Sequence, residues 1–280
     1  MRRIDVKEIG RVVADLCIEA NCHLGEDVLN VLQKKAVEEK SVTGREIIQQ
    51  LIENAGIADR EEIPMCQDTG VAVVFIDIGQ EVALTGGDLY DAVNNGVKEG
   101  YTRGYLRKSM VMDPLDRVNT GDNTPAVVHL KLVPGDRVRV TLAPKGGGSE
   151  NMSSLKMLKP AEGIEGIKKF VIDTVKVAGP NPCPPVVVGV GIGGTMEKAA
   201  LMAKHALTRP LGTKNDDCDT DMLEKEILQE INKLGIGPQG MGGAVTALAV
   251  HIEKYATHIA CLPVAVNISC HAYRHKAVII

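Results

Sequence analysis

The sequence contains no tryptophan and few other aromatic residues, with two phenylalanines and five tyrosines among 280 residues. Proteins that bind single-stranded nucleic acids stack the bases on such side chains. The chain also lacks a basic excess, because 32 Lys and Arg are outnumbered by 36 Asp and Glu, for a formal charge of −4. Nucleic acid is therefore not expected as a partner.

Long apolar runs are also absent. No segment approaches the roughly 18 consecutive apolar residues of a membrane span. Asp5 and Glu8 interrupt the N-terminal residues before an apolar stretch of signal-peptide length could form. The odd number of cysteines, seven, favours a reducing compartment in which thiols serve metals or catalysis. We therefore expect a cytoplasmic protein without a membrane partner.

The cysteines lack the close Cys-x-x-Cys pairs that are typical of zinc fingers. Three of them lie instead in separate turn-like segments: Cys66 near Pro64, Cys183 between two prolines, and Cys270 within residues 267–271. Prolines fix the backbone and remove amide donors, so rigid loops would aim these thiols. Three distant thiolates that converge on one point would suit an iron–sulfur cluster with one iron left open.

A single cysteine is more often a small buried apolar residue than a ligand. We expect that simpler role for Cys17 and Cys22 in a helix and for Cys261 in an apolar strand. Cys218 stands among aspartates, which indicates an exposed thiol. Only the three cysteines in rigid loops are therefore candidate ligands.

Apolar residues recur at helical spacing over residues 9–17, 28–36 and 47–52. Thr43 and Glu46 form a capping box that predicts the start of the third helix, and Gly56 predicts its end. Further helices are predicted near residues 88–100, 151–158, 161–176, 195–207 and 220–234.

Strands are predicted at residues 71–78, 186–190, 245–252 and 258–268. Residues 127–133 and 138–142 read as a hairpin around a turn at 134–136. No internal repeat or long linker is present. The pattern predicts a mixed α/β (α+β) protein, with a helical N-terminal part, short sheets, and loops that converge on one site. Residues 1–280 would form one domain, with two lobes as an alternative.

Two glycine-rich segments invite other interpretations. GVGIGG at 189–194 satisfies G-x-G-x-x-G between a strand and a helix, but a dinucleotide fold also places an acidic residue at a strand end about 20 residues later. Asp216 and Asp217 are the acids at that distance, and both lie in a polar loop, so the glycines more simply permit close backbone approach. KGGG at 145–148 lacks the Walker spacing, yet its bare amides could form an anion-binding concavity.

Four segments together carry a resemblance to a known family: MCQDTG at 65–70, NTGDNTPA at 119–126, KGGGSEN at 145–151 and GPNPC at 179–183. The chain resembles, over nearly its whole length, the alpha subunit of the iron–sulfur class I fumarate hydratases. The related L(+)-tartrate dehydratase alpha subunit shares most of these segments. The resemblance implies a 4Fe-4S hydro-lyase of the tricarboxylic acid cycle that interconverts fumarate and L-malate, with the open iron as Lewis acid.

The resemblance also assigns roles to residues. It implies Cys66, Cys183 and Cys270 as cluster ligands, Asp68 and His258 as catalytic residues, and Gln67, Arg107, Gly147 and Gly148 as substrate-binding residues. Each has an ordinary alternative, because Asp68 could serve only the local turn and His258 could be a buried core residue. Arg103 is the alternative to Arg107.

No convincing base for the carbon-bound proton is evident in the sequence. Two-subunit members of the family place further substrate-binding residues on a separate beta subunit, so we expect that partner and a homo- or hetero-oligomer. Three alternatives stay open: an L(+)-tartrate dehydratase alpha subunit, a nucleotide-binding oxidoreductase built on the glycines at 189–194, and a non-catalytic iron–sulfur protein.

Overall fold

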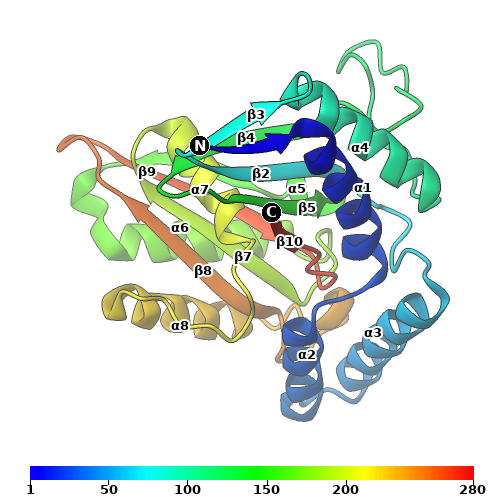
Figure 1. The fold of residues 1–280 in the computed structure, drawn as a ribbon. Coiled ribbons are helices and arrows are strands. Elements are labelled where there is room, and N and C mark those ends of the chain that lie inside the picture. The colour runs from blue at the N-terminus through cyan, green and yellow to red at the C-terminus, as the bar shows by residue number, and fades with distance from the viewer. The chain divides into compact units, whose positions relative to one another are not determined.

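The computed structural model describes residues 1–280 and divides them into two compact units. Unit 1 comprises Met1–Leu24, Asn54–Gly147 and Arg274–Ile280, and unit 2 comprises Gly25–Glu53 and Gly148–Tyr273. Both units combine helices with a sheet (Figure 1), which confirms the predicted mixed α/β class. None of the helices is both long and apolar enough to cross a membrane.

Unit 1 is built on a four-stranded sheet with the strand order β10-β5-β2-β4, and β1 pairs with β3 in a separate parallel ribbon. Its elements are β1 (Arg2–Asp5), α1 (Val6–Cys22), β2 (Val71–Gly79), β3 (Val82–Thr85), α4 (Leu89–Arg103), β4 (Val127–Val133), β5 (Val138–Lys145) and β10 (Lys276–Ile279). Alternate residues of the central strand, Ala72, Val74 and Ile76, are buried with α1 and α4 in one apolar core.

Helices α1 and α4 cross in close contact. A Cβ atom added to Gly96 of α4 would lie 2.3 Å from the carbonyl oxygen of Gly10 in α1, and one added to Gly100 would lie 2.6 Å from the carbonyl oxygen of Ala14. Larger side chains at these positions would force the helices apart. The contact fixes the end of α4, where the buried Tyr101 lies.

The predicted hairpin of residues 127–133 and 138–142 is wrong. Both segments are strands, but β4 pairs in parallel with β2 while β5 pairs antiparallel with the other edge of β2. The apolar β2 is buried along most of its length and takes the position between them. The turn at 134–136 therefore passes the end of β2, where the Gly79 amide donates to the carbonyl of Arg137 (2.9 Å).

Unit 2 contains the sheet β6-β9-β7-β8. Its strands are β6 (Ser154–Leu158), β7 (Val186–Gly193), β8 (Ala247–Tyr255) and β9 (Leu262–Ser269). Its helices are α2 (Glu26–Glu38), α3 (Val42–Glu61), α5 (Gly147–Glu150), α6 (Gly163–Ala178), α7 (Met196–Ala206) and α8 (Cys218–Asn232), with the 3-10 turns η1 (Pro160–Glu162) and η2 (Pro238–Gly240). The residues of α3 from Asn54 onward and the first residue of α5 belong to unit 1.

The central strand β7 has two different faces because its sequence alternates valine or isoleucine with glycine. Val188, Val190 and Ile192 are buried in a core that includes residues of α6 and α8. Gly189 and Gly191 face α7, where an added Cβ would lie 2.1 Å from a helix carbonyl oxygen at either position. Figure 1 shows α7 packed on this sheet. Gly189 and Gly191 thus permit the close backbone approach that the simpler interpretation predicted.

Three further details of the structure differ from the predicted secondary structure. Residues 151–158 were expected to be helical, but β6 forms there because it pairs antiparallel with β9, with Ser154 opposite Val266. Helix α3 continues past Gly56 to Glu61, since Gly56 has no left-handed φ angle. Its start is also shifted, because Ser41 rather than Thr43 accepts a hydrogen bond from the amide of Gly44 (3.2 Å).

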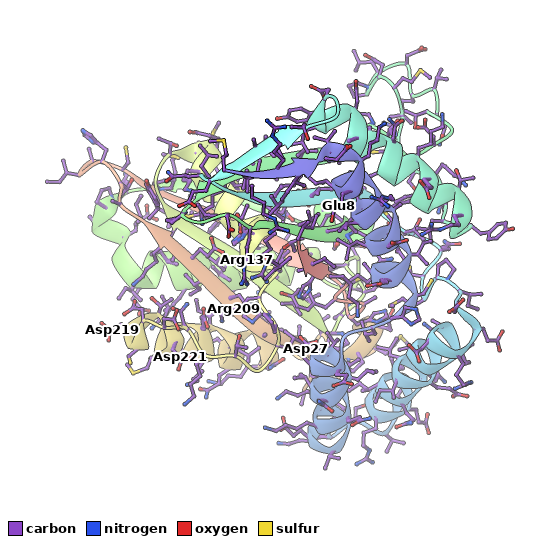
Figure 2. The ribbon with its side chains drawn as sticks, in the orientation of Figure 1. Glu8, Asp27, Arg137, Arg209, Asp219 and Asp221 are labelled. Carbon is purple, nitrogen blue, oxygen red and sulfur yellow. The ribbon has the colours of Figure 1, made fainter.

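Charged side chains hold α8 in unit 2. Glu224 of α8 is buried and accepts two hydrogen bonds from the guanidinium of Arg209 and one from the amide of Ile252 (2.7 Å). Figure 2 labels Arg209, and it also labels Asp219 and Asp221, which lie in the first turn of α8. Carboxylates are favoured there because the first amides of a helix have no partner within it.

Glu39, which follows α2, is a buried carboxylate that organises the chain before β8. It is 1% exposed and accepts hydrogen bonds from the amides of Ser41 (2.9 Å), Ala244 (2.9 Å) and Val245 (2.8 Å). Burial alone would raise the pKa of Glu39, but these amides together lower it below the ordinary 4.5 of a glutamate.

We expect Glu39→Gln to lower the free energy of unfolding by about 1–3 kcal/mol at pH 7, because one amide donor would then face an NH₂ group. A depressed folded-state pKa stabilises the protein above the unfolded pKa and ceases to do so as the pH falls through the folded pKa. The difference between wild type and variant should therefore shrink below about pH 4.5. Urea unfolding at several pH values measures this, with Glu46→Gln, at an exposed position of α3, as control. An equal effect of both substitutions would contradict the assignment.

Candidate functional site

In unit 1 the backbone of residues 65–70 is held by buried side chains. The hydroxyl of Tyr101 donates to the carbonyl oxygens of Thr69 (2.7 Å) and Gly70 (2.9 Å), and Nδ2 of Asn123 donates to the same Gly70 oxygen (3.1 Å). Burial raises the pKa of Tyr101, so the phenol remains a donor at physiological pH. These bonds fix the buried end of the loop at Thr69 and Gly70, while Gln67 is exposed.

Arg274 supports the same loop from the end of the chain. Its Nη1 donates to the carbonyl oxygen of Asp68 (2.8 Å) and to Oδ1 of Asn21 in α1 (2.9 Å). The backbone of Asn21 in turn accepts a hydrogen bond from the amide of Met65 (3.0 Å). Arg274 is 6% exposed, and its Nε has no partner. A buried guanidinium beside the loop therefore provides both hydrogen bonds and positive charge.

The side chain of Asp68 connects this loop to the glycine-rich segment. Its Oδ1 accepts from the amide of Gly70 (3.0 Å) and its Oδ2 accepts from the amide of Gly147 (2.8 Å). A Cβ atom added to Gly146 would lie 3.1 Å from Oδ2 of Asp68 and 3.7 Å from Nη2 of Arg274. Gly146 thus leaves room for the carboxylate near the guanidinium. The half-buried carboxylate has a fixed orientation, as a proton donor or acceptor requires.

The predicted substrate-binding residue Arg107 belongs to the same part of unit 1. Its carbonyl oxygen accepts a hydrogen bond from Oγ1 of Thr69 (2.9 Å), and two residues later the amide of Ser109 donates to Oδ1 of Asn123 (2.7 Å). The Arg107 side chain is exposed. Its backbone is therefore tied to residues 65–70, while its guanidinium is available to a ligand.

Unit 2 brings Cys183 and Cys270 to the same end of two neighbouring strands. Cys183 precedes β7 and Cys270 follows β9, and these strands are antiparallel neighbours with Val187 opposite Ser269. The amide of His271 donates to the carbonyl oxygen of Cys183 (3.3 Å), so the two segments touch. Cys183 has a φ angle of 54°, which a residue with a side chain seldom adopts. Such strain, of about 1–3 kcal/mol, is typical of functional positions.

The three predicted ligands are thus divided between the units, with Cys66 in unit 1 and the other two in unit 2. Neither unit by itself gathers three metal-ligating side chains into one group. The donors fit an iron–sulfur cluster in their chemistry, because Cys66 and Cys270 are half-buried thiols in loops and Cys183 is exposed. Cys17 does not fit, since it is fully buried and burial raises its pKa far above the ordinary value.

His258 lies far from the cysteines of its unit, contrary to the expectation that it shares their site. It was also predicted to begin a strand, but β9 begins at Leu262 and His258 is exposed in the preceding loop. That loop precedes β9 and Cys270 follows it, so the two residues lie at opposite ends of this strand. An eight-residue strand is about 25 Å long. His258 and Cys270 are twelve positions apart in sequence, and β9 occupies most of that interval. A catalytic role for His258 remains only a prediction.

Sequence reasoning missed Arg274, Tyr101 and Asn21. Asn123 lay within a recognised segment but was given no role. Tyr101 and Asn21 look like ordinary positions on amphipathic helices, and only the crossing of α1 and α4 brings them to the loop. Arg274 follows Cys270 by four residues, which was the one local signal available.

Comparison with known proteins finds one matching family and several similar proteins. The model of the family described as Fumarate hydratase (Fumerase) matches residues 10–279. A protein of Methanocaldococcus jannaschii named "Putative L(+)-tartrate dehydratase subunit alpha" is 43% identical over 273 residues, which cover 95% of each chain. The L(+)-tartrate dehydratase subunit alpha of Escherichia coli (strain K12) is 33% identical, over 98% of this chain and 91% of its own. That of Escherichia coli (strain UTI89 / UPEC) is 34% identical, over 96% and 89%.

Proposed function

The chain belongs to the fumarate hydratase family and is a hydro-lyase of that type, and from this premise we propose that it is the alpha subunit of an iron–sulfur enzyme acting on a four-carbon hydroxydicarboxylate. The single observation that carries the proposal is the fixed carboxylate of Asp68, two residues after Cys66, within a loop held by Tyr101 and Arg274. Loss or addition of water needs such an oriented group to manage a proton.

We propose that Cys66, Cys183 and Cys270 hold a 4Fe-4S cluster. When bound, the cluster would supply a Lewis acid that weakens the bond between the substrate carbon and its hydroxyl oxygen. The thiols of the three loops would bind it as thiolates, and an open iron would follow from the absence of a fourth cysteine ligand. The proposal rests on the donor chemistry of the exposed and half-buried thiols.

The other residues would bind and orient the substrate. Arg107 has an exposed guanidinium whose planar fork suits bidentate recognition of a carboxylate. Gln67 is exposed in the same loop and can donate from its side-chain amide, and the exposed Gly147 and Gly148 bring bare backbone to the ligand. Asp68 would hold or release the proton at its carboxylate, whose oxygens the Gly70 and Gly147 amides fix.

Two substrates are consistent with this proposal. The curated relatives are named for L(+)-tartrate, which favours dehydration of L(+)-tartrate. The family description favours the interconversion of fumarate and L-malate that the sequence resemblance also implied. Malate and tartrate differ by one hydroxyl group, so a pocket that hydrogen-bonds the second hydroxyl would reject malate strongly.

The relatives are named as alpha subunits, which supports a separate beta subunit as partner. We expect the isolated chain with an intact cluster to convert L(+)-tartrate, L-malate and fumarate slowly or not at all, because no base for the carbon-bound proton is evident in it. Addition of the beta subunit should restore turnover of one of these acids. Anaerobic reconstitution and a three-substrate assay measure this.

Full activity of the chain with no second subunit present would contradict the two-subunit proposal. No turnover of any of the three acids by the reconstituted complex would contradict the substrate class. Equal activity without iron and sulfide would contradict the cluster while leaving the substrate class in place.

A further inference from the structure

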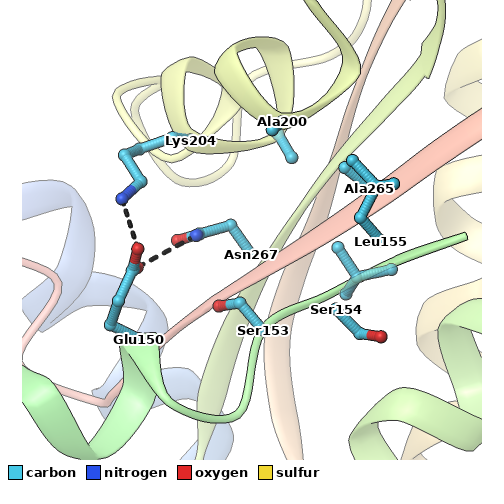
Figure 3. A pocket seen from close by; sticks show the side chains of 10 residues that line it. Glu150, Ser153, Ser154, Leu155, Ala200, Lys204, Ala265 and Asn267 are labelled. Atoms are coloured by element: carbon cyan, nitrogen blue, oxygen red, sulfur yellow. Dashed lines mark hydrogen bonds and ion pairs between the residues drawn. The ribbon is translucent and has the colours of Figure 1, made fainter. Parts of the chain in front are cut away.

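A pocket of about 320 Å³ lies in unit 2 between α7, β6 and β9 (Figure 3). Ala200, Ala203 and Lys204 share one face of α7, and Ala265 and Asn267 share one face of β9 because alternate residues of a strand point the same way. Alanines on both walls leave space that larger side chains would fill. A water molecule occupies about 30 Å³ of liquid, so the pocket exceeds what one ordered water needs.

Asn267 has a buried acceptor without a partner at this pocket. The residue is 6% exposed, and its Nδ2 donates to Oε2 of Glu150 (3.0 Å). Its Oδ1 is buried and accepts no hydrogen bond. A buried acceptor without a donor is unfavourable, so this atom indicates a missing donor.

Lys204 supplies hydrogen-bond donors at the Glu150 carboxylate that Asn267 also binds. Its Nζ donates to Oε1 of Glu150, and Figure 3 shows Lys204 and Asn267 on either side of that carboxylate. An ammonium group has three N–H donors, and the bond to Glu150 uses one of them. The polar end of the pocket therefore offers both donors and an acceptor next to an apolar wall.

We propose that this pocket binds a short-chain carboxylic acid that has a hydrogen-bond donor on its α carbon, an α-hydroxy or α-amino acid. The ligand carboxylate accepts from Lys204, and the α O–H or N–H group donates to Oδ1 of Asn267. An aliphatic side chain then lies against Ala200, Ala203 and Ala265. The site shares none of the cysteines, Asp68 or Arg107, and it does not depend on the proposed function.

Titration calorimetry of the full chain tests this with three matched probes: L-2-hydroxy-3-methylbutanoate, L-valine and 3-methylbutanoate. The third has the same carbon chain without the α donor. We expect one site per chain for at least one of the first two, and binding weaker by about tenfold or more for the third, because the bond to Asn267 is lost. The stronger of the first two probes distinguishes a hydroxy-acid site from an amino-acid site.

Three variants should weaken binding by about tenfold or more: Asn267→Leu removes the acceptor, Lys204→Met removes the donors, and Ala200→Leu fills the space. Lys198→Met is the matched control, because Lys198 is on the same helix but lies over the ring of Tyr255, 4.8 Å from its centre. Far-ultraviolet circular dichroism verifies that each variant is folded. The proposal would be overturned if neither L-2-hydroxy-3-methylbutanoate nor L-valine showed saturable binding, if all three probes bound equally, or if Ala200→Leu bound them as the wild type does.

Discussion

Replacement of Asp68 by asparagine is expected to lower turnover of the reconstituted two-subunit enzyme by about 10²–10⁴-fold, the usual contribution of a positioned acid or base. The carboxylate is held by the amides of Gly70 and Gly147 and lies near the guanidinium of Arg274. Asparagine keeps the size of the side chain but cannot exchange a proton. Iron and sulfide content should stay near that of the wild type, because Asp68 is not one of the proposed ligands.

The substitution also has a structural effect that needs a control. Asparagine has one acceptor oxygen, so either the Gly70 or the Gly147 amide would face its NH₂ group. Asp113 controls for loss of the negative charge alone, since Oδ1 of its carboxylate, in an exposed loop, accepts from the amides of both Leu115 (2.7 Å) and Asp116 (2.9 Å). Asparagine keeps one acceptor oxygen, so Asp113→Asn can retain both bonds and should leave turnover unchanged. Wild-type turnover in Asp68→Asn would show that the site has been misplaced.

Serine in place of Cys66, Cys183 or Cys270 is expected to abolish the broad sulfur-to-iron absorbance of the anaerobically reconstituted chain, and with it all hydro-lyase activity. A serine hydroxyl is far less acidic than a thiol, so it is a poor replacement for a thiolate ligand. Loss of the absorbance in all three variants would show that each of the three thiols is needed for the cluster.

Two cysteines serve as controls for this experiment. Cys261 is half-buried just before β9, at the opposite end of that strand from Cys270. Cys218 is exposed at the start of α8. Serine at either position should leave iron content and absorbance unchanged. A normal cluster in Cys183→Ser would remove that residue from the ligand set, and loss of the cluster in Cys261→Ser would mean that the wrong thiols had been chosen.

Local sequence signals predicted where helices and strands form better than they predicted which strands pair with each other. Helices α1, α4 and α6 and the strand β7 follow from apolar periodicity, and Asp88, whose side chain accepts from the amide of Asp91, caps α4. The relation between β4 and β5 did not follow, because the turn at 134–136 is compatible with a hairpin. Only the preference of the apolar β2 for a central, doubly paired position decides against it.

The candidate site shows the same limit. Cys66, Asp68 and Arg107 could be selected from short segments that resemble a known family, and the structure brings Asp68 and the backbone of Arg107 together through Thr69. The supports of the site could not be selected, because Arg274 is 206 positions from the Asp68 carbonyl that it binds. The resemblance implied a catalytic role for His258, but the residue is exposed before β9, at the other end of that strand from Cys270, and its role stays a prediction.

The distance in sequence between Asp68 and Arg274 has a consequence for the order in which the molecule is made. A ribosome adds about 5–20 residues per second, so the 206 positions between them correspond to roughly 10–40 s of synthesis. During that interval the loop that contains Cys66 lacks its guanidinium support, and β5, once it has been made, lacks its neighbour β10. The thiol is therefore in a partly formed loop while unit 2 is still being translated. The final geometry of that loop is reached only after Arg274 has left the ribosome.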